Sequence, residues 1–217
     1  MHGKNLGLGK ALESLKRGKF VVLFDSEKRE AEADLVLPAG FATPQKIAVM
    51  RKDAGGLLCM ATDGKTAKAL NLPFASEVLV KSGNTTLKTI ALKKTAYGDA
   101  PAFSIAINHA NAFTGVTDDD KVLAAIAFTK ISGKNANRKE FERQFHSPGH
   151  LPLLIGRGLE RRRGHTELAL RLCELAGLPP AVLVCEMLDI GKALSIPKAK
   201  AYAKRDNLVF LEGSEIS

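Results

Sequence analysis

The chain has 217 residues, 45% of them hydrophobic, which suits one substantial core and is too short for two large domains. Its 32 basic and 23 acidic residues give a net charge of +9, but it has no Trp and only two Tyr. A single-strand nucleic-acid binder would interleave basic and aromatic side chains, so this composition favours an anionic small molecule over RNA. No segment resembles a membrane span, and neither nucleic acid nor membrane is an expected partner.

Hydrophobic spacing predicts helices and strands that follow one another without regular alternation in the first half. In chain order the sequence predicts a helix at 8–17, a strand at 19–24, a helix at 43–52, a strand at 57–61, a short helix at 64–70, strands at 77–81 and 102–107, a helix at 118–130, a loop at 132–139, a strand at 151–155, a helix at 166–176, a strand at 181–186, a helix at 195–205 and a strand at 208–211. This order predicts an α+β (mixed α/β) fold, a single domain over residues 1–217 with a central mixed β-sheet flanked by helices.

An acidic segment at 25–34 follows the apolar residues 20–23 and holds five carboxylates and two cations in ten positions. So many like charges repel one another unless something offsets them. A divalent cation such as Mg²⁺ or Mn²⁺ would do so, because it prefers hard oxygen ligands. A solvated turn is the alternative interpretation.

A basic segment at 161–167 combines three arginines, Gly164 and His165, immediately before an amphipathic helix. The free N–H groups and positive dipole end of a helix favour anions, and arginine donors match phosphate oxygens. The histidine can supply a metal ligand. A basic loop with His165 or Thr166 near the helix cap is the alternative.

Two further positions carry chemistry near apolar strands. Residues 147–150 predict a turn that places His150 before the strand at 151–155. Glu186 closes the strand at 181–186, and the carboxyl end of a buried strand is a common position for catalytic groups. Taken alone, Glu186 could also be an ordinary surface residue at a strand end.

These segments together resemble one family, the 3,4-dihydroxy-2-butanone-4-phosphate synthases of riboflavin biosynthesis. The matching segments keep the family's order over roughly positions 10–215; they are 29–34, 55–59, 113–117, 148–150, 163–167 and 176–186. The chain departs from the usual family residues at five positions: Ala31 for Asn, Ala33 for Gly, Ser26 for Asp, Lys121 for Arg and Ser147 for Arg. Alanine resists backbone conformations that glycine adopts, so the acidic loop should be less flexible.

The resemblance implies a lyase that converts D-ribulose 5-phosphate into 3,4-dihydroxy-2-butanone 4-phosphate and formate with Mg²⁺ or Mn²⁺. It also implies a homodimer with active sites at the subunit interface. The implied metal ligands are Glu30 and His165. The implied catalytic residues are His150, Glu186, Asp25, Glu32 and Cys59. The implied substrate-binding residues are Arg29, Glu30, Asp34, Thr114, Arg162, Arg163, Gly164, His165, Thr166 and Glu186. His2, His109 and His146 match nothing and stay unassigned.

Three cysteines without Cys-x-x-Cys spacing predict a reducing, cytoplasmic location and no zinc cluster. The missing zinc motif also argues against a fused GTP cyclohydrolase II domain. Cys59 could be a small core side chain. Two other functions stay open on the residues alone, an RNA-associated structural protein and a different metal-dependent phosphosugar enzyme, such as an isomerase or aldolase. Binding by the first would weaken steeply with salt and persist without metal.

Overall fold

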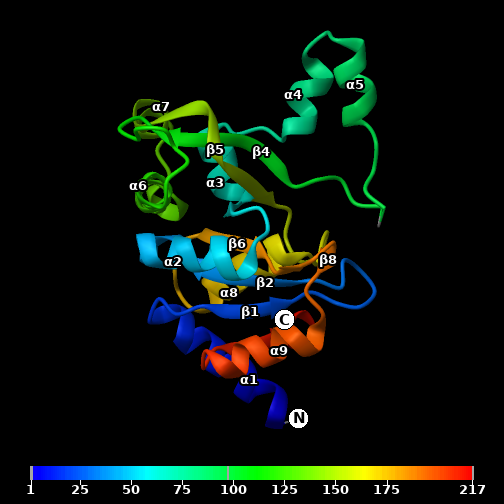
Figure 1. Ribbon diagram of the computed structural model, residues 1–217. Helices are drawn as coiled ribbons and strands as arrows, with labels where there is room; N and C mark the ends of the chain where they lie inside the picture. The colour runs from blue at the N-terminus through cyan, green and yellow to red at the C-terminus, as the bar shows by residue number, and fades with distance from the viewer. Residues whose placement is uncertain (1, 97, 217) are drawn as a thin grey trace.

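A mixed β-sheet organises the chain, whose computed structural model describes residues 2–96 and 98–216, with the side chains of 2–5 left undescribed (Figure 1). The sheet has seven strands in the order β4-β5-β3-β6-β2-β1-β9. Their bounds are β1 Val21–Phe24, β2 Ala33–Pro38, β3 Cys59–Asp63, β4 Phe103–His109, β5 Phe145–Gly156, β6 Ala181–Glu186 and β9 Val209–Glu212. β1 runs parallel to β9 and β3 parallel to β5, while the other neighbours are antiparallel. The predicted fold class is therefore confirmed.

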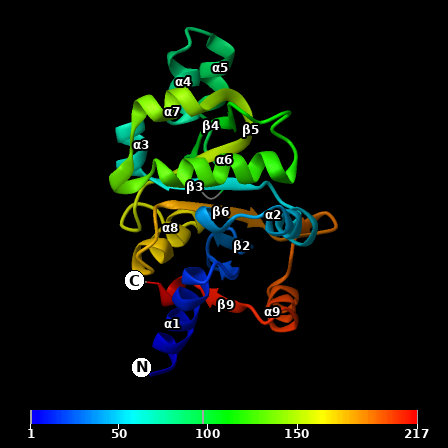
Figure 2. The ribbon, with the colours of Figure 1, turned by 90° about the vertical axis from the view of Figure 1, so that its left-hand side faces the viewer.

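Helices cover both faces of this sheet. Their bounds are α1 His2–Lys16, α2 Pro44–Val49, α3 Gly64–Leu70, α4 Ala75–Lys81, α5 Thr85–Ala91, α6 Asp118–Lys130, α7 Arg138–Gln144, α8 His165–Leu175 and α9 Ile196–Arg205. A π-helical turn, Met50–Ala54, extends α2, and a small hairpin pairs β7 (Leu188–Asp189) with β8 (Lys192–Ala193). Figures 1 and 2 show α4 and α5 as a helical hairpin at the end of the molecule opposite α1 and α9. None of the helices in the described ranges is long and apolar enough to cross a membrane.

Two apolar cores lie on the two faces of the sheet. Along β6, Leu183 and Cys185 pack with α2, α6 and α9, whereas the alternating Val182 and Val184 pack with α1 and α8. Strands buried on both faces read as continuous apolar runs, which explains why 181–186 and 20–24 lacked the polar alternation of a surface sheet. The acidic segment leaves this double core directly at the end of β1.

Several elements differ from the sequence-based expectations. The segment 77–81 forms the helix α4, and the predicted strand there is wrong; its Val78 is 46% exposed and it has no sheet neighbour. Glu77 in the first turn and Lys81 in the last suit a helix dipole. β2, α5 and α7 were not predicted, and 132–139 holds a short 3₁₀ turn and the start of α7. Residues 147–150, predicted as a turn, lie within β5, where they form a bulge without register partners in β4.

Candidate active site

Asp25 organises the acidic segment, which forms the connection between β1 and β2. The register pairs Phe24 with Ala33, so residues 25–32 form the loop. The buried Asp25 carboxylate accepts the N–H of Glu30 at 3.1 Å and that of Glu32 at 3.2 Å, and also accepts Nη1 of Arg29 at 3.2 Å. Both of its oxygens therefore hold the loop in shape.

Ala31 lies at the tip of this loop with φ of 55°, in the left-handed region. The β-carbon makes this conformation cost roughly 1–2 kcal/mol, whereas Gly and Asn adopt it more readily. The departure from the usual family residue at position 31 therefore leaves local strain, and the turn geometry is retained in spite of it.

His165, the first residue of α8, meets this loop from the far end of the sequence. It is 6% exposed, its Nδ1 lies 3.3 Å from Oε2 of Glu30, and its Nε2 lies 3.0 Å from the carbonyl oxygen of Glu32. Ligand atoms of Asp25, Glu30 and His165 all lie within 4.8 Å of one another. A buried imidazole among carboxylates offers the nitrogen and oxygen donors of a divalent-metal site.

Crowded negative charge shapes the titration of this group. Burial would lower the pKa of His165, but Asp34, Glu30 and Asp25 outweigh it and raise that pKa to about 9. Burial raises the pKa of Asp34 to about 7; His165 opposes this shift, and Glu186 and Glu30 add to it. Burial and Glu30 likewise raise the pKa of Glu32. Repulsion among the carboxylates adds to the shifts of Asp34 and Glu32, and a cation at this position would relieve it.

One oxygen of Asp34 supports a metal in particular. Oδ1 is buried, lies 3.6 Å from Nε2 of His165, and accepts no hydrogen bond from any described part of the chain. A buried acceptor without a donor is costly, and a cation or its water would satisfy it. The residues therefore fit a divalent ion.

Arginines from two segments converge beside the cluster. Nε of Arg162 and Nη2 of Arg29 both donate to Oδ2 of Asp99, each at 3.2 Å. Nη1 of Arg162 donates to Oε2 of the buried Glu167 at 2.6 Å. A β-carbon on Gly164 would lie 2.5–2.8 Å from these two guanidinium groups, so any other residue here would push the arginine side chains from their present positions. The turn thus gathers two cations at the start of α8.

Arg163 and Thr166 take different positions in this turn. Nη2 of Arg163 donates to the carbonyl oxygens of Ile216 at 2.7 Å and Gly213 at 3.4 Å, so its guanidinium holds the turn against the segment after β9. Thr166 is buried in the first turn of α8.

Glu186 lies on the strand next to Asp34, its register partner in β2. Its Oε2 accepts the N–H of Leu57 at 2.8 Å, and its carbonyl oxygen accepts the N–H of Gly56 at 3.0 Å. A β-carbon on Gly56 would come within 2.5 Å of both acceptor oxygens, which explains the glycine. The buried Cys59 follows on β3, and burial raises the pKa of its thiol, so it is protonated at neutral pH.

His150 and Thr114 belong to a second group, joined through Asn108 on β4. The exposed His150 donates its N–H to Oδ1 of Asn108 at 2.8 Å, and its Nδ1 lies 3.2 Å from Nδ2 of the same amide. The N–H of Thr114 donates to Oδ2 of Asp120 at 3.1 Å. Gly115 packs on Asn108, where a β-carbon would come within 2.2 Å. Among the described residues, the hydrogen bonds and ion pairs of this group do not reach the acidic cluster.

Sequence reasoning missed four residues of these two groups. Asp99 and Asn108 carry no local signal, because their roles depend on partners distant in the sequence. Glu167 belongs to the basic segment at 161–167, and Asp120 belongs to the acidic start of α6. Both lie in segments that the sequence analysis described, but neither residue was assigned a function. His109 packs its ring against Phe145 at 5.5 Å, edge to face, and is a core residue. The side chain of His2 lies outside the described residues.

Comparisons with known proteins point in one direction. Residues 9–217 match the family model described as 3,4-dihydroxy-2-butanone 4-phosphate synthase. A Methanosarcina mazei protein of that name is 41% identical over 223 residues, covering 98% of this chain and 90% of the relative. A Campylobacter jejuni protein of that name is 33% identical over 216 residues and covers 98% and 57%. A solved structure of such a synthase in complex with two magnesium ions superposes with a TM-score of 0.78 at 25% identity, covering 96% of this chain and 93% of that one.

Proposed function

This chain belongs to the 3,4-dihydroxy-2-butanone 4-phosphate synthase family of enzymes in riboflavin biosynthesis, and from that premise we propose that it converts D-ribulose 5-phosphate into the butanone phosphate and formate. The observation that carries the proposal is the contact between two segments far apart in sequence. Ligand atoms of Asp25, Glu30 and His165 lie within 4.8 Å of one another, and two arginines, Arg29 and Arg162, stand beside them. Such an arrangement binds a metal and an anion next to each other.

Glu30 and His165 are the proposed metal ligands. Both oxygens of Asp25 already accept hydrogen bonds from the loop, so we assign that residue to holding Glu30 in place. When bound, Mg²⁺ or Mn²⁺ supplies a Lewis acid that stabilises negative charge next to the sugar carbonyl, contributing roughly several kcal/mol. Glu32 and Asp34 lie beside these ligands, and burial makes their carboxyls easier to protonate.

The phosphate of the substrate is assigned to Arg29, Arg162 and the start of α8 with Gly164 and Thr166. Arg163 is assigned a structural role, because its guanidinium group donates to backbone carbonyl oxygens of the segment after β9 and so fixes the turn before α8. Glu186 is assigned to proton transfer at Oε1, because its Oε2 is held by the N–H of Leu57. Cys59 is assigned to packing beside Glu186, since a protonated buried thiol is a poor nucleophile.

His150 and Thr114 enter the proposal through a second subunit. Both belong to the group around Asn108, and the loop beside Thr114 exposes 96% of Phe113. We assign them to the active site of a partner copy in a cytoplasmic homodimer. Mixing inactive His150→Asn and Glu186→Gln variants should then restore part of the activity, because mixed dimers contain one intact site. If mixtures stay inactive after subunit exchange, both residues serve one subunit.

The direct test of the reaction is incubation with ribulose 5-phosphate and Mg²⁺ while formate is measured. Formate should be released, EDTA should abolish the release, and added Mg²⁺ or Mn²⁺ should restore it. An isomerase or aldolase with the same metal and anion sites would consume the sugar phosphate without forming formate. Full turnover after EDTA treatment would contradict the metal assignment.

A further inference from the structure

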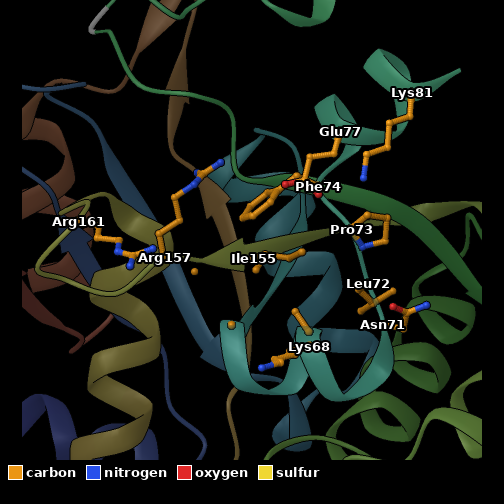
Figure 3. A pocket seen from close by; sticks show the side chains of 13 residues that line it. Lys68, Asn71, Leu72, Pro73, Phe74, Glu77, Lys81, Ile155, Arg157 and Arg161 are labelled. Atoms are coloured by element: carbon orange, nitrogen blue, oxygen red, sulfur yellow. The ribbon is translucent and has the colours of Figure 1, made fainter. Parts of the chain in front are cut away.

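A groove of about 660 Å³ lies between α3, α4 and the end of β5, apart from the acidic cluster (Figure 3). Its lining includes four cationic side chains, Lys68, Lys81, Arg157 and Arg161, and one acidic side chain, Glu77. Apolar surface comes from Leu72, Pro73, Phe74 and Ile155. A volume of this size suits a ligand of about mononucleotide size, since small-molecule sites span roughly 300–1,000 Å³.

Arg157, one of the lining residues, is held in place on the wall of this groove. Its two terminal nitrogens donate to the carbonyl oxygens of Ala100 at 3.1 Å and Pro101 at 2.9 Å, and its guanidinium carbon lies 4.2 Å from the centroid of the Phe74 ring. Burial lowers its pKa most and the charge of Arg162 lowers it further, while Glu167, Asp99 and Glu77 act in the opposite direction. An anion bound here would offset the repulsion between Arg157 and Arg162.

The other cations stand around the mouth of the groove, as Figure 3 shows. Within residues 2–96 and 98–216, Lys68, Lys81 and Arg161 form no ion pair with any acidic group. The groove thus combines three cations that lack acidic partners among the described residues with an apolar wall that contains one aromatic ring. A ligand with an anionic end and a flat apolar end would match this combination.

We propose that this groove binds an organic phosphate that carries a planar aromatic ring, as a nucleoside monophosphate does. The phosphate contacts the cations at the mouth, and the ring packs against Phe74, Pro73 and the guanidinium plane of Arg157. The site is separate from the proposed reaction: Arg161 adjoins Arg162 in the basic segment 161–167, but none of the groove residues is a proposed metal ligand or substrate-phosphate contact.

Calorimetric titration with AMP at about 0.1 M salt tests the proposal, because salt screens exposed charges without abolishing a multivalent site. Lys68→Ala and Lys81→Ala should each weaken binding roughly three- to tenfold. Lys65→Ala on α3 and Lys88→Ala on α5 are matched controls, since both lysines are exposed and lie outside the groove. The controls should leave the affinity unchanged.

Two further variants identify the site and the ligand class. Phe74→Leu should weaken binding of AMP but not of inorganic phosphate. Arg29→Ala alters the proposed substrate-phosphate site and should leave AMP binding intact, so the result stands whether or not formate is released. Absence of AMP binding, equal losses in the control lysine variants, or loss of binding in Arg29→Ala would each overturn the proposal.

Discussion

Replacing Glu167 with Gln should weaken the turn that carries Arg162 while keeping the size of the side chain. The Glu167 side chain is 0% exposed and that of Arg162 is 9% exposed. Oε2 accepts Nη1 of Arg162 at 2.6 Å, and Oε1 accepts the N–H of Arg157 at 3.1 Å. Glutamine offers one acceptor oxygen and one NH₂ group, so it can satisfy one of these donors and must face the other with hydrogens.

The expected loss in the free energy of unfolding follows from this unsatisfied donor. Removing one partner of a buried ion pair costs roughly 3–5 kcal/mol, and a hydrogen bond to a charged group contributes about 1.5–3 kcal/mol. Because Gln keeps one of the two acceptors, we expect a loss of about 2–4 kcal/mol in the free energy of unfolding. Total stability of a domain is about 5–15 kcal/mol, so the variant should still fold.

Urea denaturation measures this loss, and the KM for ribulose 5-phosphate should rise because Arg162 is no longer held. Glu174→Gln is the matched control on the same helix, since its carboxylate is 71% exposed and pairs with Arg171 at the surface. The control should change stability by less than about 0.5 kcal/mol. A double-mutant cycle with Arg162→Ala should show non-additive losses. A loss below about 1 kcal/mol, or strict additivity, would refute the assigned coupling.

Three other outcomes are expected. Asp99→Asn should tighten binding of inorganic phosphate, measured by calorimetry. The reason is that the Asp99 carboxylate, which pairs with the guanidinium groups of Arg29 and Arg162, is replaced by a neutral amide. Weaker binding would mean that Asp99 only positions the two arginines. Glu186→Gln should lower kcat for formate release by about 10²–10⁴-fold with folding intact, as for a lost general acid–base group, and wild-type kcat would return Glu186 to a structural role. Burial raises the pKa of Asp120, but backbone N–H groups of residues 113–115 outweigh it and lower the pKa to about 2. Since this folded value lies below the unfolded value of 3.8, its stabilisation is complete above about pH 4 and is lost as pH falls toward 2. Acid titration of the free energy of unfolding should therefore be steeper for the wild type than for Asp120→Asn, and equal slopes would contradict the assignment.

Much of the fold could be predicted because both faces of the sheet are buried. Strands such as 181–186 then read as apolar runs, and the helix at 118–130 begins at three aspartates that suit its dipole. β2 escaped prediction because it begins inside the acidic segment, where Ala33 and Asp34 look like loop. The segment at 77–81 was wrongly predicted as a strand, because it looks like a strand but forms a helix. Its three consecutive apolar residues have strand composition, but no neighbouring strand is available to pair with them.

In the candidate site, too, residues within a recognisable local segment could be predicted, whereas residues that depend on distant partners could not. The meeting of Glu30 with His165 was anticipated through the family resemblance, and their contact at 3.3 Å agrees with it. The roles assigned to them stay predictions. Asp99 could not be foreseen, because nothing near it in sequence marks it as the shared acceptor of two arginines. Residues that act through a distant partner leave no local pattern.

The parallel pairing of β1 with β9 joins the beginning of the sheet to residues 209–212, across nearly the whole chain. Contacts between residues so far apart in sequence form late in folding, because the entropy cost of closing a long loop must be overcome first. The strand β1, from which the acidic loop leaves, therefore gains one of its two neighbouring strands only after the rest of the chain has been synthesised. Until then β1 is an open edge with unpaired backbone groups, the kind of surface that pairs with other chains. Proteolysis that removed residues 209–216 would expose that edge again and also take away the carbonyls that hold Arg163, so aggregation and loss of the phosphate turn should accompany each other.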